Sequence, residues 1–225
     1  MSLYTVNELQ SKIATIIDHT VTAPGSSTDE FAWRLGFINR AYQEWATAYD
    51  WEALRKEVFL GVTGVSQASI SLPADFRKMA MEPILYGDAD INYAVSYPEI
   101  PPEDRKLYLD SDEYFYILGS RENQTMILNP ATLASGASLL ISYFSFPTSL
   151  VSSGDSTVIS DPEFVVDRTI AYILQTRSDP RYQQIESSAR EKLIQMVDNE
   201  KDKGLSMNNP VMTPEQRSGF RIGRD

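Results

Sequence analysis

The sequence predicts an α+β protein in which helices from both ends of the chain form a bundle, with an antiparallel β-rich region inserted between them. Apolar side chains from Phe31 to Tyr49 recur every three or four residues, which is the spacing of one helix face. The pattern changes to alternation at Val58, and two more helical stretches follow Asp161. These changes divide the chain into residues 1–50, 51–160, 161–203 and 204–225.

Two helices are predicted before the β-rich region. Thr5 and Glu8 have the spacing of a capping box, which indicates a first helix over residues 5–19. Residues 22–27 have the composition of a linker, and Ser27 or Thr28 is suited to cap a second helix over 28–49. The apolar face of this second helix comprises Phe31, Leu35, Ile38, Tyr42, Trp45 and Tyr49.

Short strands with turn-forming residues between them follow Trp51. Residues 58–62 and 68–72 read as a hairpin, and Pro73 ends its second strand because proline cannot donate to a ladder. A second hairpin is expected from residues 114–118 and 125–128. The remaining expected elements are strands at 79–86, 91–95 and 138–144, a turn at 87–90 and one helical turn at 101–108.

Two helices and an arm complete the chain. Residues 154–160 read as a linker, and Asp161 with Pro162 marks the start of a helix that is apolar almost all round and is therefore expected to be buried. Asp179 and Pro180 separate it from a last helix, which is expected to stop at Gly204. Residues 204–225 contain few apolar side chains and are expected to form an extended C-terminal arm.

Composition limits the possible functions. The 225 residues include no cysteine, so no disulfide or thiolate metal site can form, and no apolar run reaches the ~20 residues of a membrane helix. The absence of cysteine fits synthesis in a reducing cytoplasm, and the N-terminus lacks the basic region and apolar core of a signal peptide. A net charge of −11 argues against general nucleic-acid binding. Acidic residues concentrate between Glu82 and Glu113, whereas the arm is slightly basic.

Candidate catalytic groups are weak, and no cofactor is predicted. His19 is the single histidine, so a histidine triad or a multi-histidine metal site cannot form within one chain, and a solvated helix end is the preferred interpretation. The acidic residues that could bind a divalent cation, or form a channel or loop surface, are Asp88, Asp90, Asp110, Asp112 and Glu113. Solvated turns are the preferred interpretation of these clusters, since their spacing matches no complete calcium loop.

Aromatic residues are the other candidates. Trp45, Trp51 and the 114–116 stretch are interpreted as core, because no lysine or arginine is interleaved with them for stacking on bases. Trp33 lies off the main helix face, so it is a candidate interface residue. The arm has two open interpretations. It has no role, or it folds onto a partner with an aromatic anchor and flanking cations: Phe220, Arg217, Arg221 and Arg224.

Several segments resemble the head-to-tail connector, or adaptor, proteins of tailed bacteriophages. The similar segments are 38–45, 50–55, 71–78 and 141–144, followed by helices at 161–176 and 181–197. The resemblance covers residues 28–200, and the first helix and the arm lie outside it. Its most recognisable parts, 38–45 and 50–55, are expected to serve packing rather than binding.

The resemblance implies a structural virion protein at the neck, made in the host cytoplasm. Such proteins form a ring, typically of twelve copies, between the portal protein and the tail or next neck protein, and double-stranded DNA passes through the lumen. The helical part and the C-terminal arm of related adaptors hold the portal. No catalytic residue, cofactor or metal is implied. The alternative class is a virion-associated hydrolase or carbohydrate-binding protein that uses the β-rich region, because two carboxylates suffice for glycoside cleavage.

Overall fold

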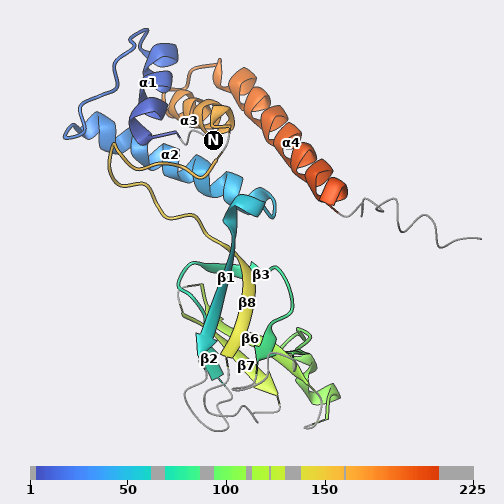
Figure 1. Ribbon diagram of the computed structural model, residues 1–225. Helices are drawn as coiled ribbons and strands as arrows, with labels where there is room; N and C mark the ends of the chain where they lie inside the picture. Colours follow the sequence, from blue (N-terminus) through green and yellow to red (C-terminus); the bar gives the residue numbers. More distant parts are fainter. Residues whose placement is uncertain are drawn as a thin grey trace, which may run out of the picture.

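Figure 1 shows a computed structural model in which helices gather at one end of the molecule and strands at the other. The structure describes residues 4–61, 69–86, 94–109, 113–121, 123–129, 138–159 and 161–207. The chain order is helix, helix, strands, helix, helix, so the predicted α+β class is confirmed. The helices are α1 (Val6–Ile17), α2 (Asp29–Ala48), α3 (Glu163–Thr176) and α4 (Tyr182–Met207), with short 3-10 helices η1 (Glu52–Leu54) and η2 (Asp104–Leu107).

The N-terminal helices begin where their caps predict. Thr5 and Glu8 form the complete capping box of α1, in which the Thr5 N–H donates to the Glu8 carboxylate at 2.7 Å. Thr28, rather than Ser27, caps α2 by accepting the Phe31 N–H at 3.2 Å. Both caps satisfy backbone donors that have no partner inside a helix. The exposed His19 has a φ of 55° just beyond α1, so it ends that helix in solvent as expected.

Helix α3 is the centre of the helical part. It contacts α1, α2 and α4, and most of its side chains from Phe164 to Leu174 are buried, as its apolar sequence predicted. Helix α4 does not stop at Gly204 but continues to Met207. A helix tolerates an internal glycine at a cost of about 1 kcal/mol, and the Lys201–Asp198 and Lys203–Glu200 pairs support this last stretch.

The apolar face of α2 leads into a stack of aromatic rings. Tyr42 stacks on Trp45 with centroids 5.8 Å apart, and Trp45 stacks on Trp51 at 4.9 Å. The Trp51 indole N–H donates to the Trp45 carbonyl at 2.7 Å, a group left free by the end of the helix. Segments 38–45 and 50–55 therefore pack the end of α2 onto η1.

The strands form two antiparallel sheets. The first has the order β1-β8-β4-β5, with β3 also paired to β8, and the second has the order β2-β7-β6. Their bounds are β1 (Arg55–Gly61), β2 (Ser69–Ser71), β3 (Phe76–Met79), β4 (Ile84–Tyr86), β5 (Ala94–Ser96), β6 (Tyr114–Ser120), β7 (Asn123–Asn129) and β8 (Ser138–Ser145). Side chains from both sheets fill one apolar core that includes Phe76, Phe115, Met126 and Ile141.

The predicted hairpin of residues 58–62 and 68–72 is wrong. Strand β1 pairs along its whole length with β8, and β2 pairs with β7 in the other sheet. Leu139 and Ile141 of β8 are fully buried. Pairing with β8 therefore places the inward-facing side chains of β1, Val58 and Leu60, against the common core. Pro73 does end the strand before it, since β2 stops at Ser71.

The hairpin of β6 and β7 is confirmed. Gly119 has a φ of 111°, and a Cβ there would lie 2.1 Å from the Asn123 carbonyl oxygen, so only glycine fits. The short helical turn near 101–108 is η2, and the last strand is β8. The predicted strand 79–86 is interrupted, because β3 ends at Met79 and β4 begins at Ile84, after Pro83. Strand β4 pairs with β5. The expected turn at 87–90 lies outside the described residues.

Residues 147–159 lie along the helices rather than forming a free linker. The Asn39 side chain exchanges two hydrogen bonds of 2.8 Å with the backbone of Leu150, and the Val158 N–H donates to the Tyr42 hydroxyl at 3.0 Å. Thr5 forms a β-bridge with Ser156. The division of the chain at residues 50, 160 and 203 stays a prediction.

Candidate partner-binding surfaces

Two of the predicted site residues lie in the described part of the chain. Trp33 is on α2 and Glu113 immediately precedes β6; both are exposed. The others lie outside the described residues: Asp88, Asp90, Asp110, Asp112, Arg217, Phe220, Arg221 and Arg224. Their assignment stays a prediction.

Trp33 is held in place although its ring is partly in solvent. The side chain is 38% exposed and meets Phe37 edge to face, with centroids 5.1 Å apart and an interplanar angle of 86°. The guanidinium of Arg177, which follows α3, lies 5.9 Å from the Trp33 ring centre. An aromatic side chain that is already fixed loses little conformational entropy when a partner covers it.

The contacts of Trp33 continue into a row of aromatic and arginine side chains, here called the aromatic–arginine row. Its members are Trp33, Phe37, Arg40, Arg168, Tyr172 and Arg177. Tyr172 is at the centre, with the guanidinium groups of Arg40 and Arg168 4.1 Å and 4.6 Å from its ring centre. The sequence pattern singled out Trp33 alone, because Tyr172 at the centre of the row is on α3, far from α2 in the chain.

The charges of the aromatic–arginine row are unequally compensated. Glu44 accepts hydrogen bonds from Arg168 at 2.8 Å and from the Tyr172 hydroxyl at 2.6 Å, and Arg168 also bonds Glu186 at 3.0 Å. Burial, together with the bond to Glu44, raises the pKa of Tyr172. Arg40 and Arg177 are exposed and form no ion pair within the described part of the chain. The row therefore presents an aromatic ring with two uncompensated cations, which suits an acidic partner surface.

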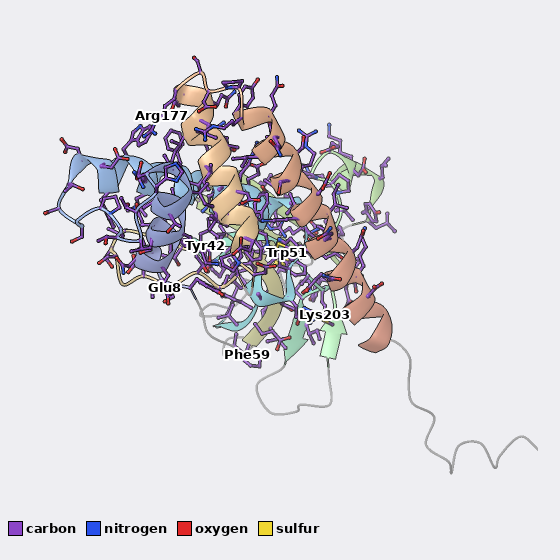
Figure 2. All side chains as sticks on the ribbon, turned by 90° about the horizontal axis from the view of Figure 1, so that it is seen from above. Glu8, Tyr42, Trp51, Phe59, Arg177 and Lys203 are labelled. Carbon is purple, nitrogen blue, oxygen red and sulfur yellow. The ribbon has the colours of Figure 1, made fainter. Side chains whose placement is uncertain are left out.

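A second surface is a groove between η1 and the C-terminal half of α4, here called the Trp51 groove. It has a volume of about 620 Å³. The apolar residues that line it are Trp45, Trp51, Ala53, Val158 and Met196, and the polar ones are Glu52, Asp161, Asn199, Glu200 and Lys203. Figure 2 shows Trp51 beside α4 and Lys203 close to the end of that helix. Nothing in the sequence pattern indicated this groove, since its walls come from three distant segments.

The described acidic residues of the 82–113 stretch do not converge on a site. Burial, and then the carboxylate of Glu113, raise the pKa of Tyr97, while burial alone raises the pKa of Glu99. Across the described residues, no group of three or more His, Asp and Glu side chains is placed to hold a metal ion. The described helices include none that is long and apolar enough to cross a membrane.

The chain is similar to known phage proteins. The model of a family described as SU10 adaptor protein matches residues 4–210. A search of curated proteins finds no match. Among solved structures, a chain from the neck of an empty GTA particle, computed with C6 symmetry, aligns over 77% of this chain and 84% of its own length, with 14% identity and a TM-score of 0.28. The family match covers nearly the whole chain and confirms the resemblance to phage adaptors: the chain belongs to the SU10 adaptor protein family.

Proposed function

We propose that the protein forms a ring-shaped adaptor between the portal protein and the tail at the phage neck, and that it acts by binding rather than by chemistry. The observation that carries this proposal is the family match over residues 4–210. The ring is a homo-oligomer, proposed to hold twelve copies as in related adaptors. It is a virion component synthesised in the host cytoplasm.

A ring requires two different surfaces on each subunit, which meet head to tail and close by rotation. The aromatic–arginine row and the Trp51 groove lie in different parts of the helical end, so they supply two such surfaces. The row, with Trp33, Arg40 and Arg177, is proposed to meet an acidic surface of the portal or of a neighbouring subunit.

The acidic stretch is proposed to face the DNA channel. Its members Asp88, Asp90, Asp110, Asp112 and Glu113 would repel the phosphate backbone and let double-stranded DNA slide without sequence-specific contact. The arm, residues 204–225, is proposed to bind the portal or another partner protein: Phe220 anchors it, and Arg217, Arg221 and Arg224 meet carboxylates.

Imaging the purified protein with its portal tests the function. Negative-stain electron microscopy is expected to show rings or collars on the portal vertex, and their rotational symmetry gives the copy number. A higher-resolution map of the same complex is expected to place the acidic stretch at the lumen. A monomer that ignores the portal and cleaves or binds glycans would instead support the hydrolase or carbohydrate-binding alternative.

A further inference from the structure

The Trp51 groove has an apolar floor that no other part of the described chain fills. Trp45 and Trp51 lie stacked beside Met196 and Val158 there. A cavity of about 620 Å³ lies within the range of small-molecule pockets, so it has room for an aromatic side chain. Tyr42 and Trp51 stack on Trp45, so an occupant contacts the accessible edge of Trp51 together with Ala53, Val158 and Met196.

The rim of the groove is acidic. Glu52, Asp161 and Glu200 face one cation, Lys203, which is already paired with Glu200 at 3.0 Å. Arg55 compensates Glu52 only at 3.6 Å, and the Glu52 side chain is 66% exposed. An occupant that matches this groove therefore carries an apolar or aromatic anchor next to positive charge.

Such a segment exists in the same sequence. Residues 208–225 contain one aromatic side chain, Phe220, with Arg217 and Arg221 close beside it. Their arginines outnumber their acidic residues. An aromatic anchor flanked by arginine is the composition typical of binding hot spots.

The course of α4 favours a groove on another subunit over the chain's own. The helix passes the groove at Lys203 and continues without a break to Met207, and Figure 1 shows its end pointing away from the rest of the molecule. The residues that follow, if extended, span about 60 Å, which is enough to reach a neighbour in a ring. If each subunit places its C-terminal segment in the groove of the next subunit, the contact joins two different surfaces, which is the kind of contact that closes a ring.

We infer that the Trp51 groove of each subunit receives the Phe220 segment of a neighbouring copy, with the Phe220 ring against the apolar lining of the groove and its flanking arginines at the acidic rim. This inference rests on the proposed ring. It gives the arm a specific partner, a second copy of this chain, and makes ring closure depend on residues 208–225.

Engineered disulfides test the inference cleanly because the chain contains no cysteine. One full-length variant carries Ala53→Cys, which lines the groove and is exposed, and another carries Ser218→Cys. The two are mixed, alone and with portal, then oxidised and resolved on non-reducing gels. A covalent dimer between the two variants can form only between subunits. The matched control replaces Ala53→Cys by Ser187→Cys, an exposed position of α4 outside the groove.

The expected result is a crosslink for the groove cysteine and none for the control. Adding Glu200→Arg to the groove chain is expected to lower the yield by about tenfold, and adding Arg221→Glu to the other chain to restore it, since the two charges exchange places. Rings on the portal without this crosslink would overturn the inference and leave the proposed function standing. A double variant that crosslinks only within one chain would also overturn it. Absence of both rings and crosslinks would reject function and inference together.

Discussion

At the scale of single residues, Trp33 is an exposed aromatic side chain that is proposed to bind a partner. Its ring is held by Phe37 and Arg177 but remains 38% exposed. We expect Trp33→Ala to weaken binding to the portal or to the neighbouring subunit by about 2 kcal/mol, roughly 30-fold, as for a buried aromatic anchor. Surface plasmon resonance on immobilised portal measures it. Val21→Ala, which changes an apolar side chain that is 81% exposed elsewhere, is the control; equal affinities for both variants would remove Trp33 from the interface.

Thr169 gives a second residue-scale prediction, on stability. Its side chain is fully buried in α3, and its hydroxyl has no hydrogen-bond partner among the described residues. Valine has nearly the same shape and the same β-branching, so Thr169→Val should raise the free energy of unfolding by about 1 kcal/mol. Urea denaturation measures it. Thr169→Ser keeps the hydroxyl and deletes a methyl group, and should lower stability; a destabilising Thr169→Val would mean that the hydroxyl is satisfied.

At the scale of elements, α1 depends on a loop far away in sequence. The backbone carbonyls of Asp155 and Ser153 accept the N–H groups of Val6 and Asn7 at 2.8 and 3.0 Å, two donors that a helix start leaves free. The Asp155 carboxylate holds this loop by accepting from the Ser152 hydroxyl and from the backbone N–H groups of Ser152 and Val151. These bonds lower the pKa of Asp155 from 3.8 to about 2.

Because the pKa of Asp155 is lowered, the stability that this loop contributes depends on pH. A carboxylate with a lowered pKa contributes stability above its ordinary pKa, and loses it as the pH falls through the folded-state value. Asp155→Asn should therefore lower the urea midpoint near neutral pH, and the difference from the unmodified protein should shrink between pH 3.8 and about 2. Asp198→Asn, an exposed carboxylate on α4 with one lysine partner, is the control. If the difference in urea midpoint between Asp155→Asn and the unmodified protein stayed constant down to about pH 2, the negative charge of Asp155 would not contribute to stability.

The elements themselves were largely predictable, because their signals are local. Capping residues predicted the starts of α1 and α2, and the two strand patterns at 114–118 and 125–128 predicted the hairpin of β6 and β7. The pairing of β1 with β8 was not predictable, since the two strands are separated by most of the β part and only their shared core selects the partner. The end of α4 was missed because glycine only weakens a helix, and no proline follows it directly.

At the scale of the whole molecule, the surfaces were less predictable than the fold. Trp33 was a candidate interface residue from its position off the helix face, and it stays one, whereas Arg40, Tyr172 and Arg177 join it only when α2 and α3 pack together. The Trp51 groove likewise needs η1 and α4 side by side. A one-dimensional pattern shows which face of each helix is apolar, but not which polar groups from two helices meet at the surface.

An ion-paired cluster at Asp50 joins the helical and β parts and should control their coupling. Asp50, after α2, pairs with Arg77 of β3 at 2.6 Å and with Lys78 at 2.5 Å. The Arg77 side chain is only 13% exposed, whereas that of Lys78 is 52% exposed. Removing the carboxylate takes away the charged partner of a largely buried guanidinium and leaves it the Tyr49 carbonyl at 3.2 Å, which costs about 1–3 kcal/mol, while an exposed ion pair is worth at most about 1 kcal/mol.

We therefore expect Asp50→Ala to loosen β3 against the helices, and Lys78→Ala to have little effect. Hydrogen–deuterium exchange measures this. Exchange in segment 76–79 should accelerate in Asp50→Ala while the α3 amides, buried in the separate helical core, stay protected. Uniform acceleration in both parts would show that they unfold as one unit. Equal effects of the two variants would assign the coupling to Lys78 and not to the buried Arg77, because only the Asp50 substitution breaks the ion pair of Arg77.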